Sequence, residues 1–123
     1  MNKKVSDNFL WGGALSGCQA EGAYNLDGKT MTIPEVMRFD DKMDRKVTKQ
    51  MHITKEMIQA AKTDGDTVFY PKRRGIDFYH TFKEDLALMA EMGFQVFRYF
   101  ISWARVFPNG DEKDPNPKAS YFN

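Results

Sequence analysis

The most regular hydrophobic pattern of the chain lies between Asp77 and Met92. Apolar side chains recur there at spacings of four and three residues, namely Phe78, Phe82, Leu86 and Met89. This period places them on one face of an amphipathic helix. Asp77 is well placed to accept hydrogen bonds from the free N–H groups of the first turn, and Gly93 to end the helix in a left-handed conformation. We therefore predict a helix from Asp77 to Met92 that buries one apolar face.

The segment that follows this helix is almost continuously apolar. Residues Phe94 to Ile101 have the composition of a strand buried on both faces, as in a parallel sheet covered by helices. Arg98 is the exception, because alternation places it on the same face as Val96 and Phe100. A buried guanidinium keeps its charge and needs an anionic or carbonyl partner. Arg98 therefore either faces a carboxylate or an anionic ligand in a site, or reaches solvent along its stem near the strand end.

A second apolar run, Phe9 to Leu15, predicts the first strand. Gly12 and Gly13 within it indicate close approach of another backbone or of a ligand, since glycine otherwise weakens a strand. The run opens into small and polar residues from Ser16 to Gly22. Because ligands of α/β proteins bind at loops that leave the carboxyl ends of parallel strands, this loop is a candidate binding loop.

Two side chains of this loop are candidates for chemistry. The amide of Gln19 offers one acceptor and two donors to a vicinal diol, although hydrogen bonding to the local backbone is the more ordinary role of such an amide. Glu21 is either an acid or base, or, more commonly for a lone glutamate, an anchor of the loop. Cys18 has no histidine nearby and is predicted to be an inert thiol. His52 and His80 are far apart and have no ligand at metal-binding spacing, so no metal site is predicted.

Residues 27–75 show little periodicity. A helical turn over Ile33 to Met37 is predicted from its proline, and a helix over Thr54 to Ala61 from its composition and its threonine cap. The basic cluster at 72–74 is interpreted as a solvated face rather than a phosphate site. Because so long a stretch without regular pattern is unusual in a compact domain, residues 40–75 are predicted to be an insertion or loop region over the site.

Composition narrows the class of protein. A chain of 123 residues has the size of one small domain, and 18 basic against 17 acidic residues give a net charge of +1. This balance does not favour a nucleic acid or a membrane surface as partner. The apolar runs are too short to span a bilayer, and residues 1–7 lack the apolar core of a secretory signal, which predicts a cytoplasmic protein. The single cysteine excludes an internal disulfide.

The predicted elements form one βαβ unit rather than a complete domain. Two strands and one main helix leave both sheet edges unpaired and one face of the sheet uncovered. After the second strand, residues 102–107 lead to a turn at 108–110 and a polar, proline-bearing tail. We therefore expect the beginning of a larger α/β domain. The alternative is a small non-catalytic α/β module that binds a sugar or a protein and is completed by oligomerisation.

Two motifs carry a resemblance to a known family. Residues Phe9 to Ala23, FLWGGALSGCQAEGA, resemble the N-terminal signature of family 1 of the glycoside hydrolases, in which an F-x-W-G run precedes a Q-x-E-G-A loop. Residues Tyr79 to Gly110 resemble that family's first barrel helix, second strand and following loop. Within the family, the Tyr-Pro pair at 70–71, the IDFYH string at 76–80 and the EMGF and FPNGDE strings are most similar to bacterial 6-phospho-β-glucosidases.

The resemblance implies a (β/α)₈ TIM barrel that hydrolyses β-glycosides with retention through a glutamate nucleophile and a glutamate acid/base. Such a pair sits ~5 Å apart. In the family these glutamates come from N-E-P and E-N-G motifs, and neither string occurs in this sequence. A barrel needs ~250 residues. Residues 1–123 are therefore expected to be the N-terminal portion, about two βα units, of a single glycosidase barrel domain, and to be inactive and marginally stable alone. The implied substrate is a small-molecule β-glycoside, 6-phosphorylated, and no cofactor is implied.

Three positions, Gln19, Glu21 and Arg98, carry over from the family. Gln19 matches the glutamine that hydrogen-bonds hydroxyls of the cleaved sugar, and Arg98 matches the arginine beside the nucleophile. Glu21 matches the loop glutamate of the signature and is expected to be structural. Trp103 falls in the S-W string after the second strand and is expected to pack at the barrel top. Three positions depart from the family pattern without removing a catalytic group: Cys18, Thr30 and Thr81.

Overall fold

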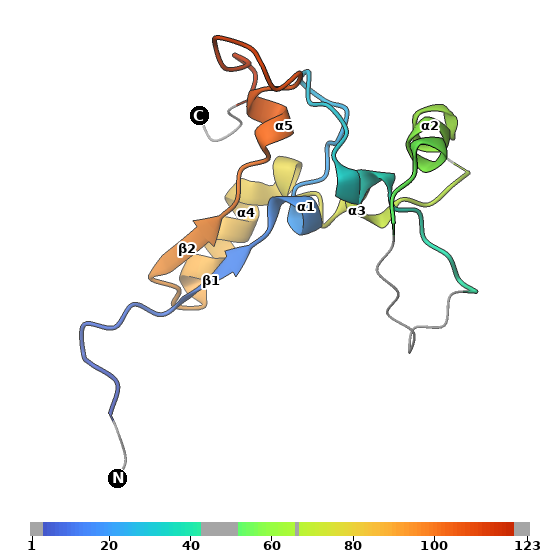
Figure 1. Ribbon diagram of the computed structural model, residues 1–123. Helices are drawn as coiled ribbons and strands as arrows, with labels where there is room; N and C mark the ends of the chain where they lie inside the picture. The colour runs from blue at the N-terminus through green and yellow to red at the C-terminus, as the bar shows by residue number, and fades with distance from the viewer. Residues whose placement is uncertain (1–3, 43–51, 66, 120–123) are drawn as a thin grey trace.

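A computed structural model describes residues 4–42, 52–65 and 67–119 as a two-stranded sheet with a succession of mostly short helices (Figure 1). In chain order the elements are β1 (Gly12–Leu15), α1 (Gly17–Ala20), the 3₁₀ helix η1 (Ile33–Val36), α2 (Lys55–Thr63), α3 (Pro71–Arg74), α4 (Phe78–Glu91), β2 (Val96–Tyr99) and α5 (Trp103–Val106). Within these described ranges, no helix has the length and apolar character needed to cross a bilayer.

The two strands pair in parallel, which confirms the predicted βαβ unit. Gly12 lies opposite Val96, and the register runs on to Leu15 opposite Tyr99. A Cβ atom on Gly12 would overlap the carbonyl oxygen of Val96. The close approach that this glycine predicted is therefore that of the β2 backbone. The N–H groups of Gln95 and Val96 extend the pairing, because they donate to the carbonyl oxygen of Trp11 at 2.7 and 3.3 Å.

Helix α4 covers one face of the sheet and leaves the other open (Figure 1). Phe78 at the start of α4 is fully buried, and its ring centroid lies 5.9 Å from that of Phe97 and 5.2 Å from that of Tyr99. The alternate residues Val96 and Arg98 are exposed. The prediction that this strand is buried on both faces is therefore wrong for the described residues, because they place no second layer on the opposite face of the sheet.

The predicted amphipathic helix is confirmed as α4, but its cap differs from the prediction. Gly93 ends the helix with a φ of 88°, as expected. Asp77 occupies the N-cap position, yet its side chain makes no capping hydrogen bond. Its backbone is left-handed with a φ of 60°, and its carboxylate instead contacts Nδ1 of His80 at 2.7 Å. Asp77 therefore begins the helix through its backbone conformation rather than through a side-chain cap.

A cluster of buried hydrophobic residues lies away from the sheet, where η1, α2 and α3 meet (Figure 1). The predicted helix at 54–61 is confirmed as α2, and Oγ1 of Thr54 accepts from the N–H of Met57 at 3.3 Å. Helices α1, α3 and α5 were not predicted. The described residues of the range 40–75 thus contain two helices, and the origin of this range as an insertion stays a prediction. The buried residues of this cluster are Val36, Ala61 and Tyr70.

Candidate functional site

The segments that leave the carboxyl ends of the two strands lie side by side. Helix α1 follows β1 and helix α5 follows β2, and parallel pairing brings both to the same edge of the sheet (Figure 1). A Cβ atom on Gly17 would lie 2.6 Å from the carbonyl oxygen of Phe100, so the two backbones nearly touch there. Farther along, the N–H of Thr30 donates to the carbonyl of Ala104 at 3.2 Å. This edge is where α/β proteins bind ligands.

Arg105 connects these two segments from a fully buried position. Its Nε donates to the buried carboxylate of Glu21, 84 positions earlier in the chain. Its other nitrogens donate to the carbonyl oxygens of Ala23 at 3.0 Å and Leu26 at 3.3 Å. The guanidinium also lies 4.6 Å from the ring centroid of Tyr79 in α4. The buried charge is therefore paired and hydrogen-bonded, the condition under which a protein interior tolerates it.

Sequence reasoning did not single out Arg105, although a signal was present. The residue lies between apolar and aromatic neighbours in the string WARVF, at 103–107. The argument made for Arg98, that a cation inside an apolar segment needs an anionic or carbonyl partner, applies equally to this string. The partner proves to be Glu21, whose carboxylate is therefore engaged within the described chain.

Gln19 combines a held backbone with a side chain exposed to solvent. Its N–H donates to the carbonyl of Ser16 at 3.0 Å. Its own carbonyl oxygen would lie 2.8 Å from a Cβ on Gly75, so the turn before α4 packs directly against α1. Trp103 is 66% exposed, and its ring centroid lies 4.5 Å from that of Phe107. The sugar-binding role of Gln19 and the packing of Trp103 at a barrel top stay predictions.

Arg98 lies on the open face of the sheet and is exposed rather than buried. It stands opposite Ala14 in the register, and its guanidinium lies 5.0 Å from the ring centroid of Phe100. Among the described residues no carboxylate lies within ion-pairing distance of it. Of the two alternatives left open for Arg98, exposure to solvent is what the described residues show. The carboxylate partner stays a prediction.

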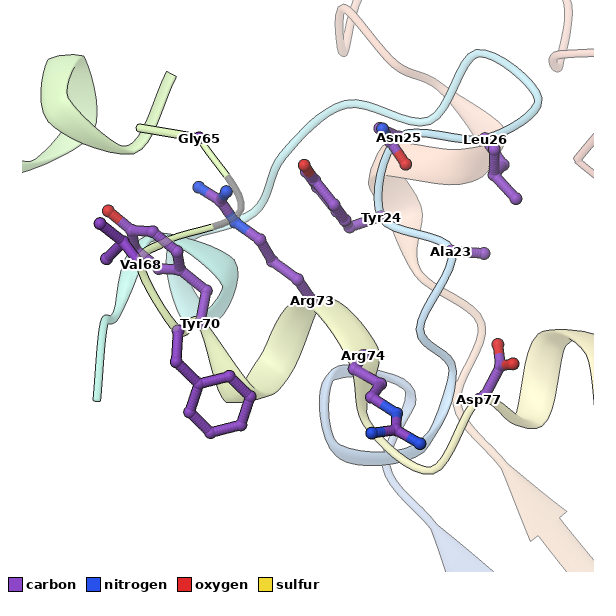
Figure 2. A pocket seen from close by; sticks show the side chains of 11 residues that line it. Ala23, Tyr24, Asn25, Leu26, Gly65, Val68, Tyr70, Arg73, Arg74 and Asp77 are labelled. Carbon is purple, nitrogen blue, oxygen red and sulfur yellow. The ribbon is translucent and has the colours of Figure 1, made fainter. Parts of the chain in front are cut away.

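A cavity of about 420 Å³ opens to solvent between the loop after α1 and helix α3 (Figure 2). Arg73 projects into it and donates to the carbonyl of Glu35 at 3.1 Å and of Ala61 at 2.6 Å. Its guanidinium also lies 4.8 Å from the ring centroid of Tyr24 and 3.7 Å from that of Tyr70. The interpretation of the basic cluster as a solvated face is therefore wrong for Arg73. Its guanidinium links α3 to η1 and α2 through these hydrogen bonds.

Two polar pairs, one part-buried and one buried, support the cluster of η1, α2 and α3. The hydroxyl of Tyr70 donates to the carboxylate of Asp64 at 2.6 Å, and burial, followed by that hydrogen bond and the charge of Asp64, raises the pKa of Tyr70. Nζ of Lys29 pairs with Glu35 at 2.6 Å, with the two side chains 1% and 4% exposed. The other oxygen of Glu35 accepts from the N–H and hydroxyl of Thr32 at 2.6 and 2.8 Å.

Neither pair is assembled for metal binding. Across the ranges that the structure describes, no group of three or more His, Cys, Asp or Glu side chains is arranged to hold a metal ion.

The arrangement of strands and loops recurs in solved glycosidases. The β-glucosidase from Thermotoga maritima in complex with noeuromycin matches with a TM-score of 0.60 and 25% identity, over 95% of this chain and 22% of that chain. The described residues thus form a portion, about two βα units, of a (β/α)₈ barrel whose strand-end loops make up one side of the candidate site.

The family follows from the sequence match. The model of glycosyl hydrolase family 1 matches residues 1–123, and the chain belongs to that family. The 6-phospho-beta-glucosidase of Clostridium longisporum is 43% identical over 94% of this chain and 21% of its own length. The aryl-phospho-beta-D-glucosidase BglH of Bacillus subtilis is 40% identical over 98% of this chain and 22% of its own. The chain therefore spans about a fifth of the length of these curated relatives.

Proposed function

We propose that this chain is part of a retaining β-glycosidase that hydrolyses 6-phosphorylated β-glucosides. The observation that carries the proposal is identity of 40–43%, across nearly the whole chain, to two proteins named for phosphorylated β-glucosides. A sugar phosphate is charged, and a charged group crosses the hydrocarbon core of a bilayer only at high cost. Such a substrate stays in the compartment in which it is phosphorylated. We propose that this compartment, and with it the location of the enzyme, is the cytoplasm.

Arg98 is proposed to pair with the nucleophilic glutamate of the complete barrel. In such a barrel the helices cover the outside of the sheet, and the alternate strand residues fill the interior. Helix α4 packs against the Phe97 and Tyr99 face of β2, which makes the open face with Arg98 the interior one. A carboxylate from another strand would supply the anion that the guanidinium lacks among the described residues.

Gln19 is proposed to bind hydroxyl groups of the cleaved sugar. Its amide is exposed at the carboxyl end of β1, the edge at which barrel enzymes bind their substrates. Glu21, two residues later, is proposed to be structural because its carboxylate is buried against Arg105. The loop after β1 would thus present Gln19 to the sugar, while Glu21 holds the loop in place.

The polypeptide of 123 residues is proposed to be inactive by itself. Retaining hydrolysis needs two carboxylates ~5 Å apart, one to attack the anomeric carbon and one to protonate the leaving oxygen. The N-E-P and E-N-G strings that carry them in the family are not in this sequence. Purified chain is expected to leave an aryl 6-phospho-β-glucoside intact at high protein concentration. Measurable hydrolysis by the pure chain would contradict this proposal.

The nucleotide sequence that follows the codon of Asn123 tests the substrate proposal. Read in all three frames, it is expected to encode both missing motifs. The protein expressed from that joined frame is expected to prefer the 6-phosphorylated aryl glucoside to its unphosphorylated counterpart. A sequence without either motif, or an enzyme with the opposite preference, would overturn the proposal.

A chimera tests whether these residues serve a glycosidase site. Residues 1–123 replace the matching segment of the Clostridium longisporum 6-phospho-beta-glucosidase, to which they are 43% identical. The chimera is expected to hydrolyse the phosphorylated aryl glucoside, and Gln19→Ala in it is expected to lower kcat/KM about tenfold or more, the order expected for loss of a hydrogen bond to the sugar. A folded chimera that does not hydrolyse the substrate would argue against the assigned site.

A further inference from the structure

We propose that Arg105 is a positioning residue that sets the place of Gln19 relative to Trp103 and thereby the binding of the sugar. The inference rests on the proposed function, because it takes the sugar-binding role of Gln19 from there. Arg105 itself is fully buried and does not touch substrate. It acts through residues 17–26, which overlap the candidate loop at 16–22 and are called the binding loop from here on. Gln19 lies near the start of this binding loop.

The contacts of Arg105 are spread along the binding loop. One guanidinium pairs with Glu21 and donates to the carbonyls of Ala23 and Leu26, so it fixes three points within six residues. Helix α1 is a single turn of four residues, and so short a helix is not stable without tertiary contacts. The position of Gln19 on this turn therefore depends on what holds the loop after it.

The backbone of the binding loop shows that its conformation is imposed from outside. Ala23 has a φ of 48°, in the left-handed region that non-glycine residues avoid. Such a conformation persists only where the surroundings over-determine it. The carbonyl of Ala23 is one of the acceptors of Arg105, at 3.0 Å. The guanidinium is thus placed to hold the one strained non-glycine residue of the described binding loop.

The same arginine belongs to the helix that carries Trp103. Helix α5 spans Trp103–Val106, and the N–H of Arg105 donates to the carbonyl of Ser102 at 3.0 Å. The backbone of Arg105 is held in turn, because its carbonyl accepts from Nδ2 of Asn116 at 3.1 Å. Since Trp103 and Gln19 are both exposed at this edge of the sheet, one buried side chain fixes the distance between the two exposed ones.

Hydrogen exchange in the chimera tests the structural half of this inference. Arg105→Lys keeps the charge, but its three N–H donors sit on one nitrogen and cannot reach the acceptors that three separate guanidinium nitrogens serve. We expect amide exchange in peptides covering the binding loop to become about tenfold faster, while peptides covering α2 keep their rate. Arg38→Lys, at an exposed position, is the matched control and should change neither. An unchanged loop, or equal acceleration in α2, would overturn the inference.

Kinetics in the chimera test the functional half. Arg105→Lys is expected to lower kcat/KM about tenfold in the chimera that retains Gln19. In the Gln19→Ala background the same substitution should change kcat/KM by less than about twofold, because Arg105 acts through Gln19. Equal losses in both backgrounds would overturn the positioning role. Failure of the unsubstituted chimera to hydrolyse the substrate would count against the proposed function instead, and the exchange experiment would still decide whether Arg105 holds the loop.

Discussion

Replacing Gly12 with alanine is expected to separate the two strands. The new Cβ would overlap the carbonyl oxygen of Val96 and lie 2.7 Å from its carbonyl carbon. A carbon–oxygen contact normally spans about 3.3–3.6 Å, so the strands must move apart by on the order of 1 Å. The hydrogen bonds to the carbonyl of Trp11, now 2.7 and 3.3 Å long, would then exceed bonding distance. With a net value of about 1 kcal/mol each, their loss alone costs about 2 kcal/mol.

Hydrogen–deuterium exchange measured by mass spectrometry reports this loss directly. A change of about 2 kcal/mol in local opening makes the amides of β2 exchange about thirtyfold faster. Gly65→Ala is the matched control, because nothing lies within 4 Å of its added Cβ. At such a site alanine is neutral or stabilising by up to about 1 kcal/mol. If Gly12→Ala left the exchange of β2 at the wild-type rate, the argument from backbone contact would be refuted.

Three further predictions concern single side chains. Lys29→Met leaves the buried carboxylate of Glu35 without its cation and should destabilise the chimera by about 3–5 kcal/mol. Lys62→Met, at an exposed position of α2, is the control and should change stability by under about 0.5 kcal/mol. Equal melting temperatures of the two variants would contradict this prediction. The raised pKa of Tyr70 means that its protonated form stabilises the fold below its ordinary pKa of 10.0, and that this contribution falls as the pH rises through the raised pKa. In an absorbance titration of tyrosinate, Tyr70→Phe should remove a component that titrates above pH 10.0, and an unaltered curve would disprove the assignment. Arg98→Met should lower kcat of the chimera about hundredfold or more if the guanidinium stabilises the charged site; an unchanged kcat would contradict this role.

Local pattern was sufficient for the long helix α4 and for the two strands. The three- and four-residue spacing of apolar side chains predicted α4, and the left-handed Gly93 ends it as expected. The glycine at position 12 predicted close approach of a backbone or of a ligand, and the structure shows the backbone of β2 there. These predictions succeed because helix period, strand alternation and glycine conformation are properties of a few consecutive residues.

Local pattern was insufficient where a partner comes from a distant segment. The basic run at 72–74 has the composition of a solvated face, but Arg73 bonds to carbonyls of η1 and α2. This contact depends on how the chain is folded back on itself.

The two arginines in apolar strings show the division most clearly. The sequence by itself determined the parallel βαβ unit and placed a candidate binding loop at the end of its first strand. Only the tertiary structure decided that Arg105 is the buried one, paired with a glutamate 84 positions away, while Arg98 stands on the open face of the sheet. The physical reason is that periodicity sets which face of an element a side chain takes, whereas its partner depends on which distant segment the fold brings to that face.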